Sequence, residues 1–553
     1  MSVEKLIVDH METWTSALQT RSTAGRGSSG KIDLYGIKKL RELILELAVR
    51  GKLVPQDPND EPASDLLKRI AAEKAELVKQ GKIKKQKPLP EISEEEKPFE
   101  LPEGWEWVHL PDIYCSISES SRKIKSSEIL PEGKYPVIEQ SQEFISGYCN
   151  NECLLIKLNN PVIVFGDHTR NIKFIDFDFV VGADGVKILS PILICERFFF
   201  WQLRSFKLDV RGYARHFKVL NSCLFALSPI AEQERIVEKV SSLMSLCDQL
   251  EQQSLTSLDA HQQLVETLLG TLTDSQNTAE LAENWARISE HFDTLFTTEA
   301  SVDALKQTIL QLAVMGKLVP QDPNDEPASE LLKRIAQEKA QLVKEGKIKK
   351  QKPLPPISDE EKPFELPEGW EWCRIGNIVN IKSELVSPKD YLNLYQVAPD
   401  IIEKGTGRVI SKRTVKESGV KGPNSRFYKG QIVYSKIRPS LSKVFLAEYN
   451  GLCSADMYPL DCYINPNYLL KYILSIPFLM QVKKAENRIK MPKLNSDSFY
   501  NIIVAIPPYN EQQAIFDKIN SIEAVCNGLI SYIGIYHKTQ LHLADALTDA
   551  AIK

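Results

Sequence analysis

Two short motifs in the sequence have the residue types of nucleotide chemistry, and each lacks a part that the chemistry needs. Residues 25–31, GRGSSGK, have the spacing of a phosphate-binding loop, but Ile32 stands where a Ser or Thr must hold magnesium and no strand pattern precedes it. A flexible linker is the better interpretation. The stretch IPPYNE contains a Pro-Pro-aromatic core of the kind used by adenine methyltransferases, but Ile506 cannot accept a hydrogen bond from an exocyclic amine. We interpret it as the start of a helix.

Other candidate sites are equally incomplete. Asp167 and His168 are an acid and a base side by side, but no nucleophile or metal cluster has a recognisable place beside them. The GTGR stretch at Gly405 lacks the third glycine of a dinucleotide loop. Cys149 and Cys153, the close pair among ten cysteines, have three residues between them instead of the two typical of zinc sites. The sequence therefore predicts reduced, mostly buried thiols, no metal site and no self-sufficient active site.

The composition is that of a globular protein with several domains. A chain of 553 residues predicts roughly three to five domains, and 43% hydrophobic with 26% charged residues argues against disorder or a fibre. The apolar runs are too short to span a membrane and no secretory signal pattern opens the chain, so we expect a cytoplasmic protein. With 69 Lys and Arg against 73 Asp and Glu, the net charge is −4. Any DNA binding must therefore come from local basic patches.

The strongest feature of the sequence is an internal duplication. Residues 51–107 return as residues 316–372 at a constant offset of 265, with six differences in 57 positions. This spacing is far too large for a solenoid repeat, so the chain consists of two large halves. The segments that follow each copy, roughly residues 108–227 and 373–506, differ in length and have little sequence in common.

A second, weaker repeat closes each half. SPIAEQER from Ser228 corresponds to PPYNEQQ from Pro507 and aligns Glu232 with Glu511 and Gln233 with Gln512. Apolar residues then follow in steps of four and three, which is typical of a coiled-coil seam, and predict helices on the order of 60 Å long. Either helix alone could be a core-facing bundle helix, but two matched copies favour antiparallel pairing within the chain. The predicted seam comprises Ile236, Val240, Leu243, Cys247, Leu250, Leu264 and Leu268 in one helix, and Ile515, Ile519, Ile522, Cys526, Leu529, Ile533, Tyr536, Leu543 and Leu547 in the other.

Each copy of the large repeat also predicts short helices and a linker. LRELILELAV from Leu40 and LKQTILQLAV from Leu305 have helical periodicity, and Ser64 is the expected N-cap of a helix over SDLLKRIAAEKAELVKQG. The tract KIKKQKPLPEISEEEKPFELPEG that follows is Pro-rich and mixed in charge. It is typical of an extended, solvated hinge.

The two variable segments are rich in β-branched and aromatic runs broken by Gly, Pro and Asn, which predicts two mixed α/β domains. They share a skeleton, because IVFGDHTRNIKFI occupies the place of IVYSKIRPSLSKVFLA, and RGYARHFKVLN that of NRIKMPKLN. Basic and imidazole side chains recur on these matched loops. Each alone could be a solvated surface charge, but as two matched sets they predict phosphate and base contacts. The predicted DNA-binding residues are Arg170, Lys173, Arg211, Arg215, His216, Lys218, Lys436, Arg438, Lys443, Arg488, Lys490 and Lys493.

Together these features resemble the specificity (HsdS) subunits of type I restriction-modification systems, especially the branch with a GKLVPQDPNDEPAS-type block. The resemblance covers most of the chain and rests on both blocks, both LPEGWEW stretches, both PPxxEQ-like helix starts and the GDHTR and GADGVKIL stretches. Two details depart from the pattern. SPIAEQ lacks the doubled proline, and Ser254 and Ser257 interrupt the first helical seam.

The resemblance implies an α/β (mixed α+β) fold with two globular target recognition domains, separated by long antiparallel coiled-coil helices in a pseudo-twofold repeat. Residues 101–228 and 366–507 would form the two domains, and residues 229–272 and 508–553 the two helices. Residues 1–100 would form an N-terminal arm, helical region and linker, and residues 273–365 a central helical region and linker. Each domain would read one half of a split, asymmetric DNA site, with rigid helices fixing the spacing.

The same resemblance implies a non-catalytic subunit. Its partners would be double-stranded DNA, two methyltransferase subunits and the restriction subunits of the full complex. SAM, ATP and Mg²⁺ would be bound by those partners, because flipping and methylating a base is the work of the methyltransferase. A self-contained methyltransferase or nuclease is the main alternative, which the missing motifs disfavour. A purely structural coiled-coil adaptor is a third, which the two strand-rich domains with matched basic loops disfavour.

Overall fold

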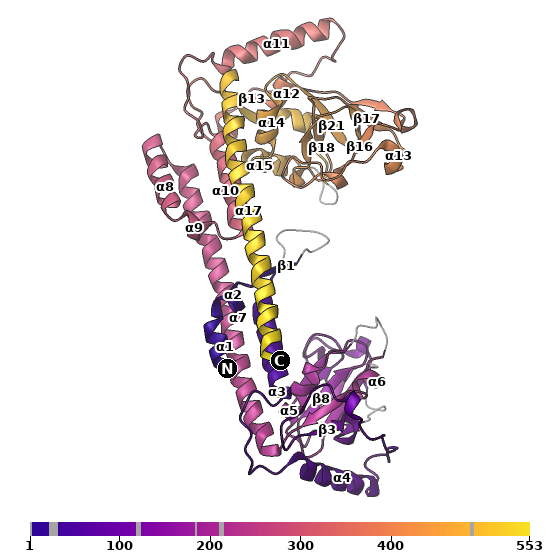
Figure 1. Cartoon of the computed structure of the whole chain (residues 1–553). Coiled ribbons are helices and arrows are strands. Elements are labelled where there is room, and N and C mark those ends of the chain that lie inside the picture. The colour runs from indigo at the N-terminus through magenta and orange to yellow at the C-terminus, as the bar shows by residue number, and fades with distance from the viewer. Residues whose placement is uncertain are drawn as a thin grey trace. The chain divides into compact units, whose positions relative to one another are not determined.

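The computed structural model describes residues 3–21, 31–117, 123–182, 185–208, 215–486 and 492–552 (Figure 1). The chain divides into two compact units, Met1–Ser257 with Ile535–Lys553, and Leu258–Gly534. Each unit therefore contains one copy of the large repeat, one variable segment and a part of each long helix. The glycine-rich residues 25–30, for which a linker was predicted, lie outside the described residues.

The variable segment of the first unit contains two four-stranded sheets. One is antiparallel with the order β4-β11-β8-β9, and the other has the order β6-β5-β10-β7 with β5 and β10 parallel. The strand VIVFG is buried along its whole length, as expected for a β-branched run inside a sheet. The strands are β4 (Tyr114–Ile117), β5 (Tyr135–Ile138), β6 (Gly147–Cys149), β7 (Leu155–Ile156), β8 (Val162–Gly166), β9 (Ile172–Ile175), β10 (Phe179–Val181) and β11 (Val186–Pro191), and helices α5 (Glu196–Ser205) and α6 (Phe217–Leu220) follow.

The variable segment of the second unit repeats this skeleton. Its antiparallel sheet has the order β14-β21-β18-β19, and its other sheet has the order β15-β17-β20-β16 with β16 and β20 parallel. The bounds are β14 (Val379–Ile381), β15 (Glu384–Val386), β16 (Tyr395–Val397), β17 (Asn424–Phe427), β18 (Ile432–Ser435), β19 (Val444–Leu446), β20 (Gly451–Ser454), β21 (Met457–Cys462), α13 (Val415–Ser418), α14 (Pro466–Ile473), α15 (Ile476–Ala485) and α16 (Ser496–Asn501). The prediction of two mixed α/β domains with a common skeleton is confirmed.

The two domains differ at one sheet edge. Strands β16, β20 and β17 match β5, β10 and β7 in chain order and in direction. The fourth strand, however, is β6 beside β5 in the first domain and β15 beside β17 in the second. Divergent sequence therefore changes which edge of the same three-stranded core is extended.

In each domain a two-stranded sheet pairs the strand that enters the domain with the strand that leaves it. We call this sheet the base of the domain. β3 (Glu106–His109) pairs antiparallel with β12 (Leu224–Leu227), so that Trp107 lies opposite Ala226. β13 (Glu371–Arg374) pairs in the same way with β22 (Ile503–Ile506), with Trp372 opposite Ala505. The WEW stretch of each repeat thus forms the entry strand, and the strand before the long helix forms the exit.

A buried carboxylate ties this base to the long helix in both units. Glu232 accepts a hydrogen bond of 2.8 Å from Trp105 Nε1, and Glu511 accepts one of 2.9 Å from Trp370 Nε1. The second oxygen of Glu232 accepts from Gln56 at 3.1 Å, as Glu511 does from Gln321 at 3.2 Å. Burial raises the pKa of both carboxyl groups, and these donors partly offset it.

The glutamine next to each glutamate makes a second tie. Gln233 Oε1 accepts from Cys195 N at 3.0 Å, and Gln512 Oε1 accepts from Asn465 N at 2.9 Å. Both glutamine oxygens thus hold the N-cap residue of α5 or α14. Both side-chain amide groups donate to the carbonyl of the residue two positions before the long helix begins. These contacts explain why the EQ pair recurs in both halves.

The long helices α7 (Ile230–Asp274) and α17 (Tyr509–Ile552) are 45 and 44 residues long. In the second unit, the C-terminal part of α7 and the N-terminal part of α17 share one hydrophobic cluster. That cluster also includes residues of α8 (Thr278–Glu290), α9 (Phe292–Leu295) and α10 (Glu299–Val314). In the first unit, Arg41 on α3 (Tyr35–Val49) bonds Asp248 on α7 at 2.5 Å and Tyr35 bonds Asp545 on α17 at 2.7 Å. The long helices contact each other as predicted, and shorter helices complete the bundles.

The added helices change which seam residues are buried. The first stretch of the predicted seam is confirmed, since Ile236, Val240, Leu243, Cys247 and Leu250 are all buried. The predictions for Leu264, Tyr536 and Leu543 were wrong, because these side chains are 51%, 38% and 44% exposed. A helix that packs against several neighbours buries a face set by all of them, and the buried residues there are Val265, Leu269, Leu272, Ala544 and Thr548.

In each copy of the large repeat, the lysine that follows the first glycine binds the C-terminal end of a long helix. Lys317 Nζ donates to the carbonyls of Thr273 and Ser275 at 2.9 and 2.8 Å, at the end of α7. Lys52 Nζ donates to the carbonyl of Ile552 at 2.9 Å, at the end of α17. A cation at a helix C-terminus satisfies free carbonyls and the helix dipole. Each block therefore holds the end of the helix that belongs to the other half of the sequence.

Two predictions for the block need correction. Helix α4 (Ala63–Lys79) begins before Ser64, so Ser64 is not its N-cap; the N–H of Ala63 bonds the carbonyl of Gly104 at 2.8 Å instead. The Pro-rich tract is extended, but it is not a free hinge. His109 Nε2 contacts Pro90 O at 2.8 Å, and the ring of Phe99 packs edge-on against Trp107 at 4.9 Å.

The ten cysteines are free thiols, of which five are buried and only Cys153 is exposed. Within the described ranges, no group of three or more His, Cys, Asp or Glu could hold a metal ion. The same ranges contain no helix that is both long and apolar enough to cross a membrane.

Trp370→Phe is expected to destabilise the second unit by about 1–3 kcal/mol, because it leaves a buried carboxylate with one donor fewer. Hydrogen exchange of the peptides around residues 366–374 and 509–515 measures the effect. Trp372→Phe is the matched control, since it makes the same change two residues away from the Glu511 network. Equal protection in the two variants would contradict the role assigned to this bond.

Candidate nucleic-acid interface

The loops that end β8 and β18 each contain an arginine in the left-handed backbone conformation. Arg170 has φ of 62° and Arg438 has φ of 45°. A left-handed backbone costs a non-glycine residue roughly 1–2 kcal/mol, so the surrounding loop must enforce it. The two arginines follow equivalent strands of two domains that have little sequence in common. The recurrence indicates that the loop conformation is a shared property of both domains.

A side chain at the end of each loop ties it to the neighbouring sheet. Asn171 Nδ2 donates to Gln140 O at 2.8 Å, and Lys443 Nζ donates to Pro399 O. Asn171 and Lys443 are equivalent, because their carbonyls accept from Gly166 N and Ser435 N, the last residues of β8 and β18. The two acceptor carbonyls lie just after the equivalent parallel strands β5 and β16. The ammonium group of Lys443 is thus hydrogen-bonded within the domain, where it holds the loop.

The second basic segment of each domain docks onto the same loop. His216 N donates to Asp167 O at 2.8 Å, and Leu494 N donates to Lys436 O at 2.9 Å. This matched bond supports the correspondence drawn between RGYARHFKVLN and NRIKMPKLN. The predicted contact residues Arg211, Arg488 and Lys490 lie outside the described residues.

Six of the predicted residues, three in each domain, are at least partly exposed. Arg215, Lys218 and Arg438 are exposed. The other three are partly buried, and each interacts with a nearby group of its own domain. Arg170 donates to Leu208 O at 2.7 Å, Lys436 Nζ lies 5.2 Å from the ring centre of Tyr458, and Lys493 pairs with Asp456 at 3.2 Å.

Two of the predicted contact residues are buried, and their side chains contact backbone carbonyls of the loops. Lys173 is only 6% exposed, and its ammonium donates to the carbonyls of Glu139, Glu143 and Phe144. Burial lowers the pKa of Lys173, and nearby Glu139 and Glu143 oppose that shift. His216 is 1% exposed, with Nδ1 3.1 Å from Asp167 O. In this structure neither side chain faces outward.

Asp167 also has a structural role. Its side chain is buried, and Oδ1 accepts from Phe217 N at 2.8 Å. The adjacent Asp167 and His168 therefore do not form an exposed acid–base pair.

The second domain also carries cation–aromatic groups that the sequence did not single out. Arg426 lies over Tyr391 and Tyr428 at 5.3 and 4.9 Å, and Lys412 lies over Tyr395 and Tyr449 at 6.0 and 5.5 Å. Apart from Arg426 and Tyr428, which are two residues apart, these pairs join separate parts of the chain, so no local pattern predicts them. Stacked guanidinium and tyrosine groups are suited to nucleic-acid contact.

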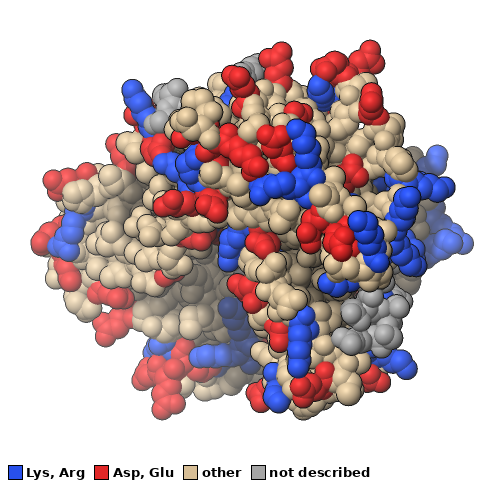
Figure 2. All heavy atoms as spheres, turned by 90° about the horizontal axis from the view of Figure 1, so that it is seen from below, with Lys and Arg blue, Asp and Glu red and all other residues tan. Residues whose placement is uncertain are grey.

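Charge is mixed on the face of the protein that Figure 2 presents. Figure 2 shows Lys and Arg intermingled with Asp and Glu over most of the face that it presents. This distribution agrees with a net charge of −4 and favours local basic sites over a general electrostatic coat.

The structure thus contains two domains with one skeleton, different sheet edges and matched loops that each carry an arginine. Comparison with known proteins gives the family. Residues 367–533 match the type I restriction modification DNA specificity domain. The chain is 51% identical to the Type I restriction enzyme EcoAI specificity subunit of Escherichia coli and 48% identical to the EcoEI specificity subunit of the same species, each over 100% of both chains. The crystal structure of the HsdS subunit from Thermoanaerobacter tengcongensis is 16% identical, with 83% of this chain and 98% of that chain covered and a TM-score of 0.38.

The chain therefore belongs to the specificity subunits of type I restriction-modification systems. It is the DNA-specificity component of such a system and not its catalytic part. The alternatives of a self-contained methyltransferase or nuclease and of a purely structural adaptor are accordingly set aside.

Proposed function

We propose that each variable domain reads one half of a bipartite, asymmetric DNA site through the loops that carry Arg170 and Arg438. The observation that carries this proposal is the recurrence of a strained, cationic loop at one place in two otherwise different domains. A shared backbone serves a shared task, such as approach to the phosphate backbone, whereas differing side chains serve differing base sequences.

The helical regions are proposed to dock two methyltransferase subunits, and restriction subunits would join that core. The near-identity of the two blocks supports this proposal, because two copies of one partner need two copies of one surface. On α17, Val525 and Tyr532 are 65% and 68% exposed and lie one heptad apart, as an apolar contact for a partner helix would. SAM, ATP and Mg²⁺ would be bound by the partners, and the work of the complex on cellular DNA would be cytoplasmic.

Exchange of residues 108–227 for the corresponding segment of another family member is expected to change one half-site only. The structure supports this exchange, because both ends of the segment lie in the two-stranded sheet of β3 and β12. Mapping of methylated bases in the host genome is the measurement. A change in both half-sites would contradict the proposal of two independent reading domains.

Arg438→Gly is expected to weaken DNA binding by the assembled methyltransferase complex about tenfold while the fold is kept, because glycine adopts positive φ without strain. Lys416→Ala, at an exposed position on α13 of the same domain, is the matched control. Titration with cognate DNA at several salt concentrations measures the loss. If Arg438 contacts a phosphate, its loss lowers the magnitude of the salt slope by about one; if it contacts a base, its loss relaxes one position of the target. Unchanged affinity would remove Arg438 from the interface.

A further inference from the structure

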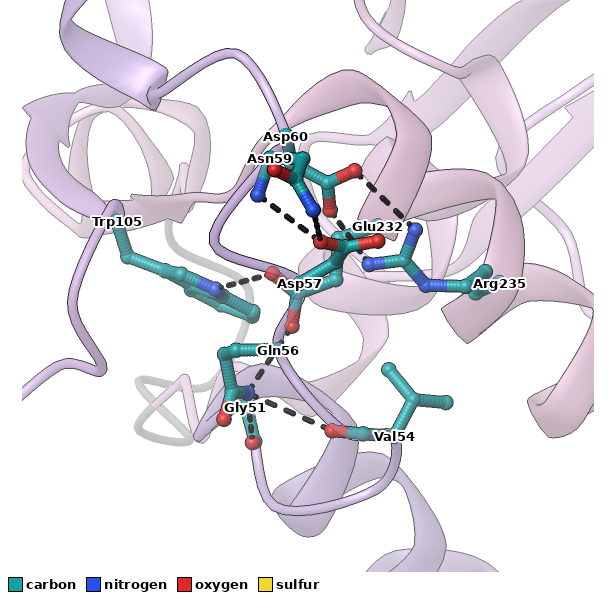
Figure 3. A network of polar contacts seen from close by, with 9 residues as sticks. All are labelled: Gly51, Val54, Gln56, Asp57, Asn59, Asp60, Trp105, Glu232 and Arg235. Carbon is teal, nitrogen blue, oxygen red and sulfur yellow. Dashed lines mark hydrogen bonds and ion pairs between the residues drawn. The ribbon is translucent and has the colours of Figure 1, made fainter.

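The two copies of the large repeat differ in how one aspartate is neutralised. In the first unit, Arg235 on α7 binds Asp60 through two nitrogens, at 2.5 and 3.4 Å (Figure 3). Asp60 is held close to the Glu232 network, and its side chain is only 10% exposed. The ion pair raises the pKa of Arg235. The first half of the protein thus contains a guanidinium group bound within the repeated block.

The second unit contains the same acidic residues without the arginine. Asp325 is the equivalent of Asp60, and Ala514 stands at the position of Arg235, the sixth residue of the helix in both cases. Asp325 instead accepts a hydrogen bond of 2.8 Å from Asn510 on the first turn of α17. An asparagine is neutral, so it satisfies one oxygen of the carboxylate and leaves the negative charge in place.

A cavity of about 370 Å³ lies beside Asp325. Four carboxylate residues line it, and its lining includes no Lys or Arg. One of the four is tied to its own turn, since Asp322 accepts from Asn324 N at 2.9 Å and from its amide at 3.0 Å. Every lining residue has an identical counterpart in the first half. The lining residues are Gln321, Asp322, Pro323, Asp325, Pro327, Ser329, Glu368, Gly369, Trp370, Glu371 and Pro508.

We propose that this pocket of the second half binds an arginine side chain of a protein partner, in the place that Arg235 occupies in the first half. Two independent observations support the choice of ligand. The aspartate equivalent to Asp325 binds a guanidinium group in the first copy, and in the second copy four carboxylate residues line the cavity beside Asp325 while the exposed Ala514 replaces the arginine. A guanidinium group matches this site better than an ammonium, because its planar fork binds a carboxylate through two nitrogens at once.

The partner is a methyltransferase subunit, and this part of the inference rests on the proposed function. The pocket is built from the second copy of the large repeat and from Pro508, the residue just before α17. These segments belong to the repeated regions assigned above to methyltransferase docking. One consequence is that the two docking regions are not equivalent. The first satisfies its aspartate from within the chain, and the second obtains the cation from its partner.

Ala514→Arg tests the proposal, because an arginine placed there fills the pocket from within, as Arg235 does. Titration of the full-length chain with the purified methyltransferase subunit, by calorimetry and sedimentation, gives the number of subunits bound and the affinity of each. We expect Ala514→Arg to weaken one of the two binding steps at least tenfold. Ala514→Met, which adds similar length without charge, is expected to weaken it less than threefold.

Asp325→Asn is the second variant, since it removes the charge without adding bulk. It is expected to weaken the same binding step and to make that step less sensitive to salt. Normal affinity in both Ala514→Arg and Asp325→Asn would overturn the arginine pocket while leaving the proposed function intact. Equal losses in Ala514→Arg and Ala514→Met would also overturn it, because bulk and not charge would then be responsible. Absence of methyltransferase binding by the unmodified chain would instead overturn the proposed function.

Discussion

The hydrogen bond between a buried glutamate and a tryptophan indole is the contact on which each half of this protein depends. It joins the first turn of a long helix to the residue just before the entry strand of a variable domain, and the same glutamate holds the start of the large repeat through a glutamine. A carboxylate this deeply buried is stable only with donors on both oxygens. The glutamine that follows it fixes the helix that covers the domain. One dipeptide at the start of a helix thus sets the orientation of block, domain and helix within a unit.

The division of the chain shows how the halves support each other. Each unit contains the end of the long helix that begins in the other half of the sequence, and a repeated lysine bonds the last carbonyls of that helix. Duplication therefore produced a reciprocal arrangement, in which each half requires the other to complete its helical core. The short helices α3 and α10 add the remaining contacts, so the long helices bury a wider face than a two-stranded seam would.

The variable domains show what divergence can change when a skeleton is fixed. The antiparallel sheet, the short sheet at the base and the left-handed arginine loops recur in both, while the fourth strand of the other sheet moves from one edge to the other. Edge strands and loops lie outside the core and tolerate substitution, whereas the central strands VIVFG and IVYS are fully buried. Substitution is therefore concentrated at the rim of each domain, while the frame stays fixed.

The sequence by itself determined the duplication, the helical closing segments, the mixed α/β class of the variable domains and the family, because these depend on identity between copies and on local periodicity. It also identified Arg170 and Arg438 as equivalent residues of the two domains, since both follow a recognisable strand. Only the tertiary structure decided which of the basic side chains are exposed to solvent. Lys173 and His216 sit in patterns no different from those of Arg215 and Lys218, yet they are buried by backbone carbonyls distant in the chain. Tertiary packing likewise exchanged Leu264 for Val265 in the helical seam and replaced the expected Ser64 cap with the carbonyl of Gly104, because burial and hydrogen bonding are set by neighbours in space and not in sequence.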